Sequence, residues 1–102
     1  MIRHIVLLKA RPDLRPGELE AVFAELAALR KVLPGMLAMS AGPDLSPEGI
    51  ARGYTHGFTM DFADAAARDA YLVHPDHKAA GARLCACGQG GREGVLVVDL
   101  EV

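Results

Sequence analysis

The sequence predicts an α+β fold in which strands and helices follow one another in the order β-α-β-β-α-β. Short runs of β-branched and apolar residues stand near both ends of the chain, one long segment carries apolar residues at helical spacing, and one central segment alternates between two kinds of side chain. A chain of 102 residues can bury one hydrophobic core and is too short for two ordinary ones, so we expect one domain over residues 1–102.

The first half of the chain predicts a strand, a helix and a weaker strand. Residues 2–10, IRHIVLLKA, form a short apolar run typical of a strand. A helix is expected to begin near Pro16 and to end at Pro34-Gly35. Its apolar residues recur at helical spacing: Leu19, Val22, Phe23, Leu26, Leu29 and Leu33. Residues 36–42 predict a weak strand, and a loop rich in Gly, Pro, Asp and Ser follows.

The third strand is expected over residues 54–62, YTHGFTMDF, where side chains alternate between two faces. One face carries Tyr54, His56, Phe58, Met60 and Phe62. The alanine-rich segment 63–74 then predicts a helix capped by Asp61 or Asp64.

Pro75 breaks or kinks that helix, and residues 76–87 predict a second short one. The segment GQGGREG is expected to be a flexible turn, because its glycines miss the G-x-G-x-x-G spacing and precede a strand. Residues 95–102, VLVVDLEV, predict the final strand.

This order of elements is the ferredoxin-like split βαβ arrangement, an antiparallel four-stranded sheet with its helices on one face. Both faces of the first and last strands are apolar: in the first strand, Ile2, Val6 and Leu8 lie on one side and Ile5 and Leu7 on the other. An apolar face without helices needs a cover, and a second copy of the sheet supplies one. We therefore expect a homodimer through the sheet faces, a dimeric α/β barrel.

Composition narrows the classes of function. The formal net charge is −2 and only 5% of residues are aromatic, which disfavours nucleic-acid binding. No apolar run is long enough to span a membrane, and the run IVLL near the start is too short for a signal peptide, so a cytoplasmic location is the default expectation. Cys85 and Cys87 are too closely spaced on a helix to form a disulfide, and we expect both to be small, partly buried apolar residues.

The segment AYLVHPDHKAAG, residues 70–81, gathers three of the six histidines and tyrosines in the chain. His77 is expected in the first turn after Pro75, where partial burial and the positive helix end favour the neutral imidazole that accepts a proton. Tyr71 lies about one turn before the break, where its hydroxyl could hydrogen-bond a substrate oxygen. His4 and His56 lie on strand faces among apolar residues.

Other chemistry is less well supported by these residues. His74 and His77 have metal-ligand spacing only within one continuous helix, which Pro75 interrupts, and adjacent Asp76 points elsewhere. We therefore expect no metal site, and the failed G-x-G-x-x-G spacing gives no indication of a dinucleotide cofactor. His74 itself is expected to end a helix, where a cation complements the helix dipole.

Four segments together resemble the stress-responsive dimeric α/β-barrel (Dabb) family: MIRHIVLLKA, GYTHGFTMDF, AYLVHPDHKA and VLVVDLEV. The resemblance implies ferredoxin-like domains whose two sheets pack face to face. A plant polyketide cyclase of this family works without a cofactor, and its motifs imply that His77 is the catalytic base and that Tyr71 assists it. They also imply a pocket lined by His4 and His56, with Phe58 on the same strand face.

The resemblance leaves two alternatives to a lyase or cyclase acting on a carbonyl compound. The same pocket could only bind a small apolar or aromatic ligand, or the histidines and Tyr71 could only lock the kink of a structural dimer. Residues 78–93 are small and flexible where the plant enzyme is bulkier, so the substrate does not carry over.

Overall fold

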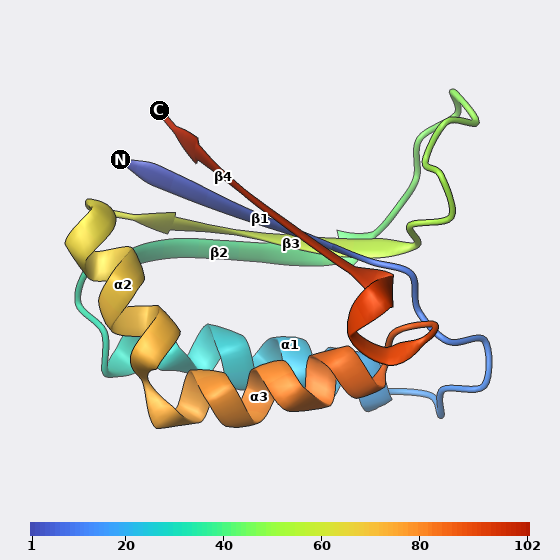
Figure 1. Ribbon diagram of the computed structural model, residues 1–102, viewed down its shortest axis with the longest axis horizontal. Coiled ribbons are helices and arrows are strands. Elements are labelled where there is room, and N and C mark those ends of the chain that lie inside the picture. Colours follow the sequence, from blue (N-terminus) through green and yellow to red (C-terminus); the bar gives the residue numbers. More distant parts are fainter.

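The chain folds into one four-stranded antiparallel sheet with all of its helices on one face (Figure 1). The structure is a computed structural model that describes residues 1–102. The strands are β1 (Ile2–Leu8), β2 (Met36–Pro43), β3 (His56–Phe62) and β4 (Val95–Glu101). The helices are α1 (Glu18–Ala28), α2 (Ala65–Val73) and α3 (Pro75–Ala86), with the short 3-10 turns η1 (Leu29–Lys31) and η2 (Gly91–Gly94).

The strand order β2-β3-β1-β4 confirms the predicted ferredoxin-like class. β1 is central and pairs antiparallel with β3 on one side and with β4 on the other. The two neighbours of β1 therefore come from distant parts of the chain. This topology brings His4 between Met60 of β3 and Asp99 of β4.

The core lies between the sheet and the helices, as the predicted periodicities require. In β1 and β3 every second residue is buried, and α1 buries Leu19, Val22 and Leu26 at steps of three and four. Helix α1 begins two residues later than expected from Pro16, because Gly17 occupies the N-cap with a φ of 82° that glycine adopts readily. The third strand also begins later than expected, at His56.

A side-chain cap begins each of the helices α2 and α3. The Asp64 side chain accepts a hydrogen bond from the Ala67 N–H and begins α2, as expected for one of the two candidate caps. At the break, His74 Nδ1 accepts a hydrogen bond from the Asp76 N–H and caps α3, with Pro75 at the first helical position. His74 also ends α2, as expected, so one residue terminates α2 and caps α3.

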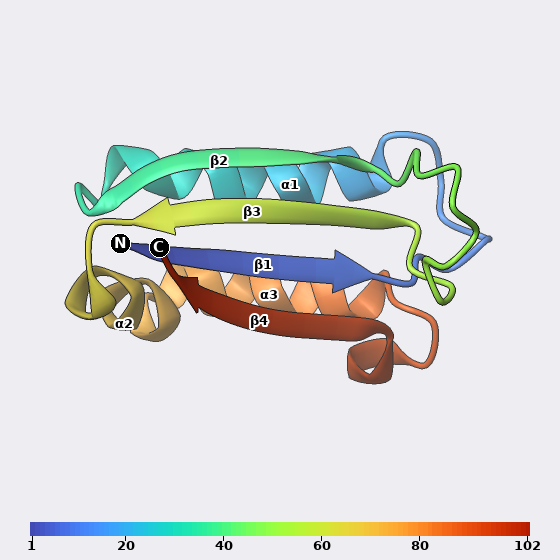
Figure 2. The ribbon, with the colours of Figure 1, turned by 90° about the horizontal axis from the view of Figure 1, so that it is seen from above.

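The opposite face of the sheet carries no helix, and Figure 2 shows the strands from that side with the helices behind them. Alternation along the paired strands places Ile5, Leu7, Leu96, Val98 and Leu100 on this face. Val98 and Leu100 retain 43% and 45% of their exposure. None of the helices is both long and apolar enough to cross a lipid bilayer.

Candidate functional site

A cleft of about 780 Å³ lies between α3 and the strands β1 and β4. Two thirds of its fifteen lining residues are hydrophobic, and none is acidic. Its lining includes His4, Phe58, Tyr71, His77, Gly81, Arg92 and Val97. The cleft is therefore a largely apolar space with a few polar groups, which is the usual character of a small-molecule site.

Tyr71 is the most deeply buried polar side chain of the cleft. It is 1% exposed, and its ring centroid lies 4.1 Å from that of His77, 5.1 Å from Phe62 and 5.7 Å from His4. Burial raises the pKa of the Tyr71 phenol, so the hydroxyl stays protonated across the neutral range. No protein group hydrogen-bonds to the Tyr71 hydroxyl. Every fully buried side-chain oxygen of the chain has a hydrogen-bond partner, so this oxygen is not fully buried. The Tyr71 hydroxyl therefore opens onto the cleft as a free donor.

His77 stands in the first turn of α3, as the position of Pro75 predicted. Its Nδ1 lies 3.1 Å from the carbonyl oxygen of Leu72. A carbonyl oxygen only accepts, so Nδ1 carries the proton and Nε2 keeps its lone pair. Desolvation lowers the pKa of His77 and outweighs the opposing effect of the Leu72 carbonyl, which favours the neutral ring at pH 7.

Gly81, one turn further along α3, leaves space in front of this nitrogen. A Cβ atom at Gly81 would lie 3.8 Å from His77 Nε2. The absence of a side chain therefore keeps the lone pair of Nε2 open to the cleft. A neutral imidazole with one fixed tautomer and an open Nε2 is suited to act as a general base.

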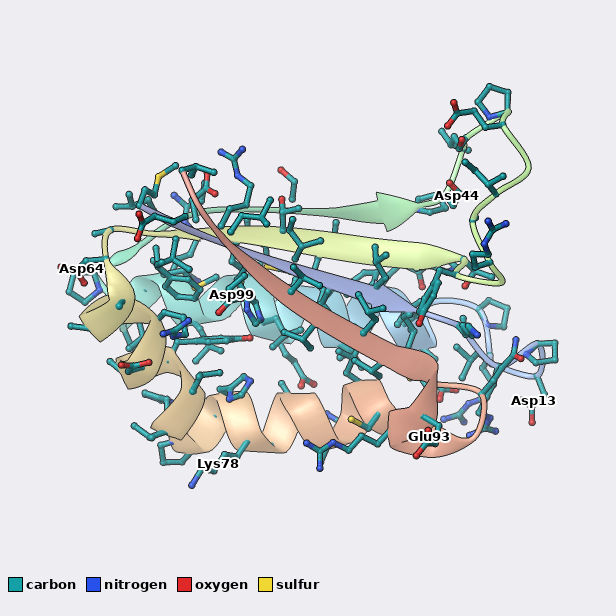
Figure 3. All side chains as sticks on the ribbon, turned by 45° about the horizontal axis from the view of Figure 1, so that its top comes forward. Asp13, Asp44, Asp64, Lys78, Glu93 and Asp99 are labelled. Atoms are coloured by element: carbon teal, nitrogen blue, oxygen red, sulfur yellow. The ribbon has the colours of Figure 1, made fainter.

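His4 enters the same space from β1 and is 4% exposed. Its Nδ1 donates to Asp99 Oδ1 at 2.6 Å, and Arg68 of α2 donates to Asp99 Oδ2, also at 2.6 Å. Burial raises the pKa of Asp99, but the hydrogen bonds from His4 and Arg68 more than compensate and hold it below the ordinary value. Figure 3 shows Asp99 on the side of β4 that faces the helices. This chain from α2 through β4 to β1 fixes the His4 ring and directs Nε2 away from the carboxylate.

The structure thus brings together four of the five residues expected to form a pocket. His4, Phe58, Tyr71 and His77 come from β1, β3, α2 and α3 and line one cleft. They combine an imidazole nitrogen with an open lone pair, a neutral hydrogen-bond donor and an apolar wall. Such a set can remove a proton next to a carbonyl and hold the oxygen on which charge develops.

His56, the fifth residue expected in the pocket, does not line this cleft. It pairs in register with Leu8, four residues along β1 from His4, a separation of about 13 Å at about 3.3 Å per residue. His56 instead lines a second cleft of about 540 Å³, with Ile5, Leu7 and Tyr54 among its neighbours. Its Nδ1 contacts the hydroxyl of Thr55 at 2.9 Å. Alternation along β3 put His56 on the same strand face as Phe58. It could not show that His56 lies too far along the strand to line the cleft with His4.

The two cysteines and the possible metal ligands form no further site. Cys85 and Cys87 are both free thiols, and burial raises the pKa of Cys87. No three His, Cys, Asp or Glu side chains are grouped so that they could hold a metal ion.

Sequence reasoning missed Asp99, Arg68, Gly81 and Arg92. Asp99 had a detectable signal, because it is the carboxylate in the otherwise apolar run VLVVDL. The other three depend on tertiary contacts that no local pattern encodes.

Comparisons with known proteins agree with the observed fold. The model of the stress responsive A/B barrel domain matches residues 2–102. The stress-response A/B barrel domain-containing protein HS1 of Arabidopsis thaliana is 29% identical over 98 residues, 96% of this chain and 86% of that protein. Olivetolic acid cyclase of Cannabis sativa is 25% identical over 76 residues, 74% of this chain and 75% of the cyclase. Among solved structures, a dimeric ferredoxin-like protein from Jannaschia sp. CCS1 is similar, with a TM-score of 0.92, 39% identity and coverage of 99% and 98% of the two chains.

Proposed function

The chain belongs to the stress responsive A/B barrel domain family, and we propose that it is a cofactor-independent lyase or cyclase that acts on a carbonyl compound. His77 is the base and Tyr71 is the acid that stabilises the developing oxyanion. The observation that carries the proposal is the His77 ring itself, whose Nδ1 is committed to the Leu72 carbonyl while Nε2 stays open to the cleft. The similarity to olivetolic acid cyclase supports the same class of chemistry.

In the proposed step, Nε2 of His77 takes a proton from the carbon next to a carbonyl group. The C–H electron pair moves toward the carbonyl, and the resulting enolate oxygen accepts a hydrogen bond from the Tyr71 hydroxyl. In an aldol closure the enolate carbon then bonds to a second carbonyl carbon of the same molecule. The new alkoxide takes the proton back from His77, so the base is regenerated.

The apolar walls contribute by reducing the exposure of Tyr71 and His77 to water. In a desolvated site the hydrogen bond from Tyr71 to an enolate is stronger than it would be in water. Burial also keeps His77 neutral and therefore able to accept a proton at pH 7. His4, held by Asp99, supplies a second polar contact that orients the substrate.

The test uses benzyl methyl ketone in deuterated buffer as a probe, because its α-protons exchange slowly without a catalyst. We expect the wild-type protein to accelerate deuterium incorporation, His77→Gln to abolish the acceleration, and Tyr71→Phe to reduce it by roughly a hundredfold. Glutamine is close to histidine in size and polarity but has no basic nitrogen, so the variant removes the base while it fills much of the same space. An exchange rate in His77→Gln equal to that of the wild type would overturn the proposal.

A non-catalytic ligand-binding function is the second candidate, since ten of the fifteen residues around the cleft are hydrophobic. It predicts saturable binding of the ketone that survives His77→Gln, with no exchange in either protein. The same experiment therefore separates the two functions.

We also propose a homodimer in which the uncovered sheet faces pack together. Val98 and Leu100 are half exposed on that face, and the similar Jannaschia protein is dimeric. Burying an apolar face of this kind is favourable and gives a two-fold interface. Sedimentation velocity is expected to give the mass of two chains, and a monomer at micromolar concentration would contradict this.

A further inference from the structure

The cleft extends well beyond His4, Tyr71 and His77, which lie at one end of it. Asp99 pairs with His4 and Val95 pairs with Leu8, so β4 runs about 13 Å along the cleft from the His4 end to the other. On the opposite wall, His77 and Cys85 are eight residues apart on α3, a distance of about 12 Å. The His77 end can therefore hold only one part of an elongated ligand.

The wall between the two ends is apolar. Val6 and Val97 line the cleft from the sheet, and Leu84 lines it from α3. Val97 remains 56% exposed, so part of this wall is open to an incoming molecule. This middle section suits a hydrocarbon chain or ring and offers few hydrogen bonds.

The far end of the cleft carries a cation without a partner. Arg92 lines the cleft from η2, next to Val95. Six of the eight arginine side chains hydrogen-bond to a carboxylate or a carbonyl oxygen. Arg52 and Arg92 are the two that do not, and Arg92 is the one in the cleft.

No acidic residue lines the cleft to neutralise this charge. Asp99 lies at the opposite end, and its two carboxylate oxygens are bound by His4 and Arg68. Lys78 contributes to the wall near His77, but Figure 3 shows its side chain directed away from the sheet. Arg92 is therefore the group best placed to bind an anion at the far end.

We propose that the ligand is an elongated apolar carboxylic acid whose carboxylate binds Arg92 and whose carbonyl reaches His77 and Tyr71. The reactive carbonyl and the carboxylate are separated by about 12 Å, the length of α3 between the two ends. Guanidinium and carboxylate groups match in a bidentate geometry, so Arg92 fixes the direction in which the ligand enters. This inference rests on the proposed function for the chemistry at His77, and the binding of the anion at Arg92 is separate from it.

The experiment uses straight-chain methyl-ketone carboxylic acids of increasing length, each paired with its methyl ester. Binding is measured by calorimetry and α-proton exchange by NMR, for the wild type, Arg92→Gln and Arg92→Lys. Arg52→Gln is the matched control, because Arg52 is also an unpaired arginine but lies outside the cleft.

We expect the wild type to prefer the acid over its ester by roughly three- to tenfold, since an exposed guanidinium contributes less than a buried one. The preference is expected to peak at the chain length that spans the cleft, to vanish in Arg92→Gln, to persist in part in Arg92→Lys and to be unchanged in Arg52→Gln. It should also shrink as the salt concentration rises.

The outcomes distinguish this inference from the proposed function. Suppose that α-proton exchange is catalysed, but that the acid is not preferred over its ester or that its preference survives Arg92→Gln. That result overturns the anion site and leaves His77 as the base. A preference for the acid that depends on Arg92, without any exchange, supports the anion site and overturns the proposed catalysis.

Discussion

Replacing Gly81 with alanine adds one methyl group beside the proposed base. The new Cβ would lie 3.8 Å from His77 Nε2, an ordinary van der Waals distance, so the helix accepts it without strain. Gly81 lies inside α3, where alanine is favoured over glycine by about 0.5–1 kcal/mol. For a domain of this size that gain corresponds to a rise in Tm of about 2–8 °C.

The same methyl group occupies space that a substrate carbon needs. Proton transfer requires a reacting carbon about 3–3.5 Å from the base, and a displacement of about 1 Å costs up to a hundredfold in rate. We therefore expect Gly81→Ala to unfold at a higher temperature and to exchange the α-protons of benzyl methyl ketone roughly ten- to a hundredfold more slowly. Thermal unfolding followed by circular dichroism and deuterium incorporation followed by NMR measure the two effects on the same samples.

Ala79→Gly is the matched control, because Ala79 is an exposed position of α3 outside the cleft. We expect it to lower Tm by a similar amount and to leave the exchange rate unchanged. Should Gly81→Ala exchange as fast as the wild type, the substrate does not approach Nε2 past Gly81, and the assignment of this nitrogen as the base is wrong.

Three further predictions follow from the histidine environments. Desolvation lowers the pKa of His77 in the folded protein, so the free energy of unfolding should have its full value above the unfolded-state pKa of about 6.5 and should decrease as the pH falls through the folded-state pKa. His77→Gln should remove this decrease, and an identical pH profile in both proteins would contradict the reasoning. Asp99→Asn should cost about 1 kcal/mol in urea unfolding and change the ¹⁵N shifts of the His4 ring, because the charged partner of His4 Nδ1 is lost; unchanged shifts would show that Asp99 does not set the tautomer. His56→Gln should leave the exchange rate unaltered, and a large decrease would place His56 in the working site after all.

The fold could be predicted because its signals are local and agree with one another. Alternate burial in β3, the spacing of Leu19, Val22 and Leu26, and the break at Pro75 each report one element without knowledge of the others. Helix ends were predicted less well, because the start of α1 depends on the positive φ of Gly17 and not on Pro16.

The candidate site could be predicted only in part, because its geometry depends on strand register. His4 faces Asp99 only because β1 and β4, which come from opposite ends of the chain, pair in one particular alignment. A shift by one residue would turn the Asp99 carboxylate to the uncovered face. The same register places His56 opposite Leu8 and removes it from the cleft. Arg92 lies in a glycine-rich turn whose pattern indicates no side-chain direction.

The two histidines of the cleft, His4 and His77, differ in the group that accepts the hydrogen bond from Nδ1. The Nδ1–H of each is bound, but the acceptor of His77 is a neutral carbonyl and that of His4 is a carboxylate held ionised by Arg68. Protonation of His77 would therefore leave a cation in a desolvated site with no carboxylate hydrogen-bonded to it. In the proposed mechanism, a proton transferred to His77 is consequently unstable there and is readily returned to the substrate, which is what a base needs if it is to act as an acid in the next step.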